Sequence, residues 1–135
     1  MSTKCVLIID PELPLGIIAN TGAILGAALG KLHPEINGDD IVSQEGFLFP
    51  GIVNIPIPVL KSNAEKIAGI HSEASNTDNI SVIAFTDCAQ PAKNYVEYTE
   101  SIQKVQTQDI QFLGICLYGD KKKVNHFAGD LPLLR

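Results

Sequence analysis

Five polar or reactive side chains lie at or near the ends of two apolar runs of the chain: Asp10, Asn20, Thr86, Asp87 and Cys88. In an open α/β sheet, ligands bind outside the carboxyl ends of parallel strands, where loops and helix starts converge. If the two apolar runs are parallel strands of one sheet, these side chains surround a common hollow. A partly buried carboxylate suits proton transfer or the anchoring of a donor group. We therefore expect Asp87 to be the acid/base or orienting group and Asn20 to hold the substrate, while the other three residues line the site.

Each of these residues also has a structural interpretation. Asp10 precedes Pro11 and can simply shape a turn, and Asp87 can cap a turn or the following helix. Cys88 precedes a predicted helix start, where free N–H groups would lower the pKa of a thiol, but no base lies near it in the sequence. A small, packed cysteine is the alternative. The sequence leaves both interpretations open.

Several common functional motifs are absent. The chain has no Gly-x-x-x-x-Gly-Lys-Ser/Thr phosphate loop, no Gly-x-Gly-x-x-Gly after its first apolar run, and no Gly-x-Ser-x-Gly elbow. His33, His71 and His126 are far apart, so we expect surface positions for them rather than a metal site. The three cysteines have neither disulfide-framework nor zinc-site spacing. The sequence therefore predicts no cofactor and no metal, and reduced thiols.

The amino-acid composition limits the classes of partner that the protein can be expected to bind. The 135 residues are 45% hydrophobic and 19% charged, with a net charge of −5, and residues 1–60 hold six acidic side chains but only two lysines. This charge argues against nucleic acid and anionic lipid as partners. The N-terminal apolar run is cut after five residues by Asp10 and Pro11, unlike a signal peptide. Residues 15–32 fall short of the roughly 20 apolar residues of a membrane span. We expect a cytoplasmic protein without a membrane partner.

The hydrophobic pattern alternates between strands and helices. The predicted strands are Cys5–Ile9, Ile52–Pro58, Ile80–Phe85 and Gln111–Tyr118. The predicted helices span residues 15–32, 62–75 with Ser62 as cap, 91–106 with Pro91 in the first turn, and 121–128. Near-continuous apolar strands indicate a sheet covered on both faces. We predict one α/β domain over residues 1–135, with three α/β/α layers and a mixed four-stranded sheet. The connection of residues 33–51 is long enough to be a flap or binding loop.

The first predicted helix has a side of small residues, formed by Ala19, Gly22, Ala23, Gly26, Ala27 and Gly30. Glycine inside a helix costs about 0.5 to 1 kcal/mol relative to alanine, so close packing against the sheet is expected to offset that cost. On this interpretation Gly26→Leu is severely destabilising. The bulkier side also needs cover, either from the 33–51 loop or from a second copy of the chain in a homodimer.

With the elements placed, the sequence resembles the type II peptidyl-tRNA hydrolases and, more closely, the family called domain of unknown function 2000. The residues that carry the resemblance are Val6 to Ile9, Leu13 to Thr21, Ile55 to Lys61, Thr86 to Ala89, Gly119, and Gly129 to Leu134. The resemblance implies the hydrolase-like fold and matches Asp87 to a functional aspartate. The hydrolases' lysine-containing turn before the first helix has no match, because Gly16 passes directly to Ile17. We expect the fold without the peptidyl-tRNA hydrolase activity.

Three functions fit these observations. The first is an enzyme, a hydrolase or transferase acting on a small polar or amide substrate. The second is a non-catalytic module that binds a small ligand or regulates through the same cleft. The third is a self-associating protein whose first helix forms a dimer interface.

Overall fold

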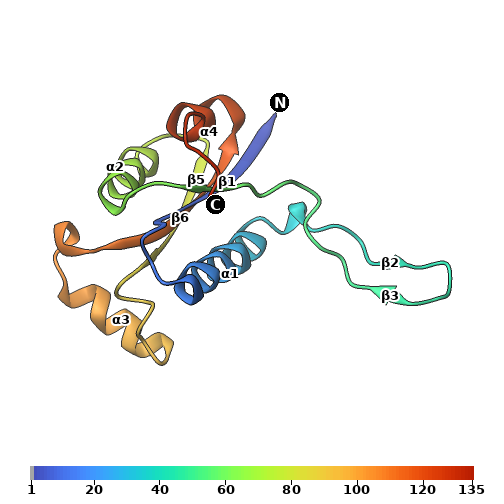
Figure 1. Ribbon diagram of the computed structural model, residues 1–135, viewed down its shortest axis with the longest axis horizontal. Helices are drawn as coiled ribbons and strands as arrows, with labels where there is room; N and C mark the ends of the chain where they lie inside the picture. The colour runs from blue at the N-terminus through green and yellow to red at the C-terminus, as the bar shows by residue number, and fades with distance from the viewer. Residues whose placement is uncertain (1) are drawn as a thin grey trace.

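Three of the predicted strands form most of a mixed four-stranded sheet in the computed structural model, which describes residues 2–135 (Figure 1). The sheet order is β4 (Val59–Lys61), β1 (Thr3–Ile9), β6 (Phe112–Asp120) and β5 (Ile80–Thr86). Strand β6 is antiparallel to both β1 and β5, whereas β1 and β4 are parallel. Strands β1 and β5 therefore run in the same direction, and their carboxyl ends share one edge of the sheet, as predicted.

The predicted strand over residues 52–58 is wrong in its position. Pairing with β1 begins only at Val59, which lies opposite Leu7. Pro56 and Pro58 have no N–H to donate to a ladder, so the apolar segment that contains them cannot pair regularly. Pro58 contributes its carbonyl alone, which accepts from the N–H of Leu7 at 2.9 Å.

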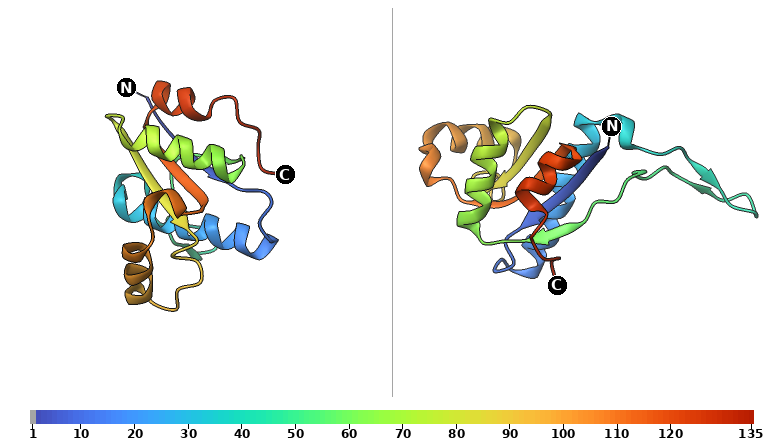
Figure 2. Two further views of the ribbon diagram at one scale, coloured as in Figure 1. Left: turned by 90° about the vertical axis from the view of Figure 1, so that its left-hand side faces the viewer. Right: turned by 90° about the horizontal axis from the view of Figure 1, so that it is seen from above.

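Helices cover both faces of the sheet, which confirms the three-layer prediction (Figures 1 and 2). Helix α1 (Leu15–Leu32) covers one face, while α2 (Ala64–Ser75) and α4 (Lys121–Ala128) cover the other. Alternate residues of each strand enter the two cores. In β1, Cys5 and Leu7 face α1, whereas Val6 and Ile8 face the other two helices.

Two helix starts differ from the prediction because asparagine side chains cap them. Helix α2 is capped by Asn63 rather than Ser62, and the Asn63 Oδ1 accepts from the N–H of Lys66 at 2.7 Å. Helix α3 (Tyr95–Lys104) begins after Asn94 instead of at Pro91, with Asn94 Oδ1 accepting from Glu97 N at 2.9 Å. Helix α3 has no buried residue and lies beyond the end of the sheet, away from α2 and α4 (Figure 2).

The first helix packs through a different face from the one predicted. Thr21, Leu25 and Leu29 of α1 are completely buried against the sheet, whereas the alanines of the small-residue side are exposed and its glycines are half-buried at the flank. A methyl group at Gly26 would have no atom within 4 Å, so Gly26→Leu is not expected to strain this packing. By length and composition alone α1 could cross a membrane, but this apolarity serves a helix packed on one side. Core packing therefore depends on Thr21, Leu25 and Leu29 rather than on the small residues.

The glycine that allows close approach is in the sheet. A methyl group at Gly114, in β6, would lie 2.7 Å from Thr21 Cγ2 of α1 and 3.1 Å from the carbonyl oxygen of Ile8. Neither neighbour can move cheaply, since one is a buried side chain of a packed helix and the other is backbone of the central sheet. Glycine at this position thus brings α1 close onto β6.

The long connection after α1 forms a projecting arm, which we define as residues 38–52. A short 3₁₀ helix, η1 (Pro34–Ile36), leads into the two-stranded hairpin of β2 (Ile41–Val42) and β3 (Leu48–Phe49). The arm extends away from the three layers in both views that show it in profile (Figures 1 and 2). An Asn37–Val53 bridge closes its base.

We predict that Gly114→Ala lowers the free energy of unfolding by about 1 to 3 kcal/mol, because the added methyl group overpacks the α1–β6 contact. Gly26→Ala is the matched control, and it should stabilise the protein by about 0.5 to 1 kcal/mol through helix propensity. Urea unfolding of both variants measures the difference. Equal stabilities would contradict the close approach described above.

Candidate functional site

The site was predicted at the edge of the sheet where β1 and β5 end. There, polar side chains mostly form hydrogen bonds with the backbone of nearby loops. Asp10 follows β1 and is buried, and its Oδ1 accepts from the N–H of Glu12 at 2.9 Å, which shapes a turn. The backbone N–H of Asp10 donates to the carbonyl of Leu113 in β6 at 3.1 Å. Its carboxylate is therefore already engaged by its own loop.

The loop after β5 is organised in the same way. The buried Thr86 Oγ1 accepts from the N–H of Cys88 at 3.2 Å. Asp87 is exposed, and its Oδ1 accepts from the N–H of Gln111 at 3.2 Å, while its own N–H donates to the Gln111 carbonyl at 3.0 Å. Asp87 thus fastens this loop to the residue that precedes β6.

The structure gathers Thr86, Asp87 and Cys88 in one loop, while Asp10 lies beyond β6 and Asn20 is exposed on α1. Two interstrand spacings separate β1 from β5, or about 10 Å. Neither Asn20 nor Asp87 lines any of five open hollows on the surface of residues 2–135. Cys88 is buried and borders a small cavity of about 270 Å³ beside α3. The catalytic role of Asp87 and the binding roles of the other four residues stay predictions.

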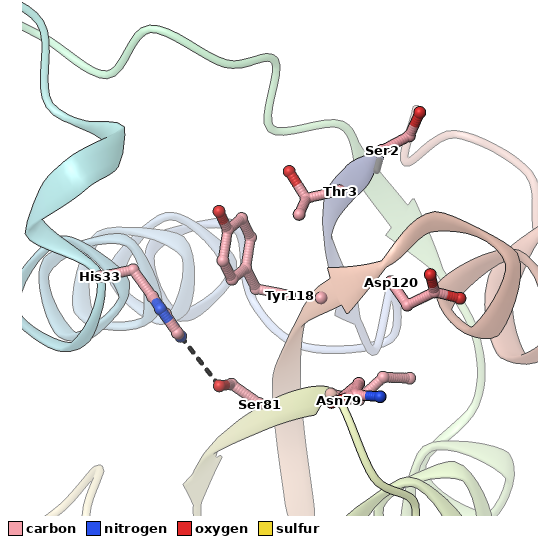
Figure 3. Close-up of a pocket in the computed structure, with 9 residues that line it drawn as sticks. Ser2, Thr3, His33, Asn79, Ser81, Tyr118 and Asp120 are labelled. Atoms are coloured by element: carbon pink, nitrogen blue, oxygen red, sulfur yellow. Dashed lines mark hydrogen bonds between the residues drawn. The ribbon is translucent and has the colours of Figure 1, made fainter.

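A different group of side chains meets at the opposite edge, where β1 and β5 begin (Figure 3). There, His33 Nε2 lies 2.8 Å from Ser81 Oγ, within hydrogen-bond distance. The other ring nitrogen, Nδ1, lies 3.4 Å from Oε1 of Glu35. The order of groups is therefore carboxylate, imidazole, hydroxyl.

Helix length brings His33 to Ser81. Helix α1 starts after the carboxyl end of β1 and runs back over the sheet for 18 residues, or about 27 Å. The seven residues of β5 span about 23 Å, so α1 ends near the beginning of β5. His33 directly follows the helix, and its N–H donates to the carbonyl of Leu29 at 2.9 Å. Ser81 is on the same face of β5 as Ile83 and Phe85, which pack under α1.

These residues border a cavity of about 470 Å³. Its lining comprises Ser2, Thr3, His33, Asn79, Ile80, Ser81, Tyr118, Gly119 and Asp120. The Tyr118 ring lies beside the imidazole, with centroids 4.4 Å apart and planes inclined by 48°. This contact and the Ser81 hydrogen bond fix the imidazole ring. The His33 side chain is only 20% exposed. The carboxylate of Asp120 is used elsewhere, since it accepts from Lys123 N at the start of α4.

The arrangement has the parts of an activated nucleophile. With the Nδ1 proton directed at Glu35, Nε2 is a lone-pair acceptor, so the Ser81 hydroxyl donates to it. A base within hydrogen-bond distance of a hydroxyl, itself oriented by a carboxylate, is the general pattern of serine-type acyl transfer. The 3.4 Å separation from Glu35 is longer than an ideal hydrogen bond, and Glu35 is 62% exposed, so this carboxylate orients the ring only weakly in the free protein.

The edge position of β5 leaves backbone donors free beside Ser81. Asp120 N donates to the carbonyl of Asn79, which makes these two residues a hydrogen-bonded antiparallel pair. Bonded and non-bonded pairs alternate along such a ladder, so Ser81 and Tyr118 also form a bonded pair. The N–H groups of Ile80 and Val82 then point away from β6, on the outer side of β5.

The sequence interpretation missed this site. His33 was expected at the surface, but it is largely buried and bonded to a strand residue 48 positions away. One signal was present, because Ser81 interrupts the apolar face that Ile83 and Phe85 continue. No linear motif joins the two residues, and their contact depends on the helix having the right length.

The thiols are separate from this site. Cys5 and Cys116 lie on adjacent strands in the core under α1, with sulfurs 3.7 Å apart. The hydrogen bond to Cys5 and burial together raise the pKa of the Cys116 thiol far above its usual range. Cys116 therefore stays protonated and is a poor nucleophile.

A family model described as "Protein of unknown function (DUF2000)" matches residues 3–135, so the chain belongs to this family. A search of curated proteins found no match. Among solved structures, the chain is similar to the protein of unknown function Atu0240 from Agrobacterium tumefaciens strain C58, with 18% sequence identity and a TM-score of 0.89 over 98% of each chain. This likeness shows that the two proteins share the fold.

We predict that Asp87→Ala destabilises the protein by about 0.5 to 1.5 kcal/mol, because the N–H of Gln111 loses its side-chain acceptor. Asp87→Asn, which keeps an oxygen acceptor, should lose less. Chemical denaturation of the two variants tests this. If Asp87→Ala is as stable as the original protein, the Asp87–Gln111 bond contributes nothing to folding.

Proposed function

We propose that the protein is a hydrolase or transferase in which Ser81 takes up the acyl group of a small ester or amide substrate. The observation that carries the proposal is the 2.8 Å contact between His33 Nε2 and Ser81 Oγ at the wall of a cavity, with Glu35 on the other ring nitrogen. The reaction class agrees with the sequence-based expectation of a hydrolase or transferase. The proposed residues differ from Asp87 and Asn20.

The reaction follows from the positions of the groups. Ser81 Oγ attacks the substrate carbonyl carbon while its proton passes to His33 Nε2, and the carbonyl electron pair moves to oxygen. Collapse of this adduct expels the leaving group, which takes the proton back from His33. Water, or an acceptor hydroxyl or amine, then attacks the acyl-serine with His33 again as base, which releases the product and regenerates the Ser81 hydroxyl.

Two features of the cavity support a small substrate. Its volume of about 470 Å³ is within the range of roughly 300 to 1,000 Å³ typical of small-molecule sites. Its lining also carries the hydroxyl groups of Thr3 and Tyr118, which can donate hydrogen bonds to a polar substrate.

The alternative of a non-catalytic binding module uses the same cavity without the chemistry. A binding protein needs the cavity walls but has no requirement for a hydroxyl held against an imidazole nitrogen. Covalent labelling therefore separates the two functions. A fluorophosphonate probe reacts with activated serines and leaves ordinary serine hydroxyls unmodified.

We predict that the purified protein is labelled by a fluorophosphonate probe and hydrolyses an activated acetate ester, and that Ser81→Ala abolishes labelling and lowers the hydrolysis rate by about 10²-fold or more. His33→Gln should have a similar effect. Ser72→Ala removes an exposed hydroxyl on α2 and is the matched control, with no expected change.

Mass spectrometry of the labelled peptide identifies the modified residue. Absence of labelling on Ser81 would contradict the proposal. If Asp87→Asn abolishes turnover while Ser81→Ala does not, the reaction belongs to the carboxyl-end loops.

We also predict that the protein does not cleave peptidyl-tRNA at a rate comparable with a type II peptidyl-tRNA hydrolase. The resemblance to that family implies a lysine turn before the first helix, but here the helix begins at Leu15-Gly16-Ile17 without one. The net charge of −5 also disfavours a transfer RNA partner. A side-by-side hydrolysis assay measures the difference, and comparable turnover would show that the missing lysine is not required.

A further inference from the structure

The arm presents an unusual apolar surface for so small an element. Six large apolar side chains on it are each between 58% and 80% exposed: Ile41, Val42, Phe47, Leu48, Phe49 and Ile52. A two-stranded ribbon without a third layer is at best marginally stable in water. Exposed apolar groups gathered on one projecting element mark an interaction surface.

The area of this surface is that of a protein interface. A large apolar side chain buries about 150 Å² or more when completely covered, so six at roughly two-thirds exposure offer about 600 to 700 Å². A stable complex buries about 800 Å² per partner. An arm that packs on a second copy, while receiving that copy's arm in return, doubles the area and exceeds this requirement.

Hydrogen bonds join the two sides of the arm at its base. Gly38 N donates to the Ile52 carbonyl at 2.7 Å, and Asn54 N donates to the Ile36 carbonyl at 2.6 Å. The Gly51 N–H donates to Asp40 Oδ1 at 2.7 Å. These bonds hold the two sides of the base together, and the tip is then about 25 Å away along an extended chain.

A groove on the body matches the arm in charge and polarity. The arm carries Asp39, Asp40 and Glu45, and it contains no lysine or arginine. At its base, a cavity of about 530 Å³ is bordered by Lys4 and Lys121 on one side and by Ile55, Pro56 and Pro58 on the other. The groove thus offers positive charge beside apolar surface, which complements Glu45 and the neighbouring Phe47 at the tip of the arm.

We propose that the protein forms a homodimer by reciprocal arm exchange, in which the arm of each copy packs into the Lys4–Lys121 groove of the other. The groove lies where the arm joins the body, so two arms that run antiparallel about a twofold axis place each tip at the base of the other. Such an interface is closed and self-complementary. This interface differs from the first-helix dimer expected from the sequence, and it does not depend on the chemistry of Ser81.

Light scattering during size-exclusion chromatography tests the assembly. We expect twice the chain mass of 14.5 kDa for the original protein and the monomer mass for Phe47→Ser/Phe49→Ser. Tyr95→Ser/Val96→Ser is the matched control, because it removes two exposed apolar side chains from α3 instead. This control should remain a dimer. Circular dichroism checks that each variant is folded.

Charge reversal tests the groove. Glu45→Lys at the arm tip and Lys121→Glu in the groove should each raise the dissociation constant at least 10-fold, and both changes in one chain should restore the dimer. A monomeric original protein would overturn the proposal, as would a dimer that survives the phenylalanine substitutions. Charge reversals without effect, or without mutual rescue, would overturn the assignment to this groove.

Discussion

The close contact between Gly114 of β6 and Thr21 of α1 sets the distance of α1 from the sheet, and with it the positions of His33 and of the arm. A helix held farther from the sheet would lift its end away from β5, so His33 would lose Ser81. The same helix end continues into η1 and the base of the arm, and the arm's direction therefore depends on it. One position without a side chain thus connects core packing, the proposed nucleophile and the proposed interface.

The two edges of the sheet have different chemistry because the chain reaches them in different ways. At the carboxyl ends of β1 and β5, short loops bind their polar side chains to nearby backbone, as Asp10 does with Glu12 and Asp87 with Gln111. At the opposite edge, a helix end and a strand start meet without an intervening turn. Side chains are free there to contact each other, and a cavity remains.

The sequence predicted the fold well where hydrophobic periodicity determines it. The strands β1, β5 and β6, the helix α1 and the three layers are confirmed, whereas β4 was displaced because proline blocks pairing at residues 56 and 58. The packing face of α1 differs from the predicted one, since burial of Leu25 and Leu29 outweighs any gain from close glycine packing. The His33–Ser81 pair depends on tertiary geometry, which periodicity does not encode. The predicted roles of Asp87 and Asn20 stay predictions.

Strand β1 pairs with a strand more than one hundred residues later in the chain, with Cys5 opposite Tyr118. Closing so long a loop costs conformational entropy before any contact compensates for it, which makes the folding of such topologies slow. During synthesis, one of the two central positions of the sheet stays empty until β6 has left the ribosome. Until then β1 and β5 have no common neighbour, so their apolar residues and unpaired edges are open to aggregation.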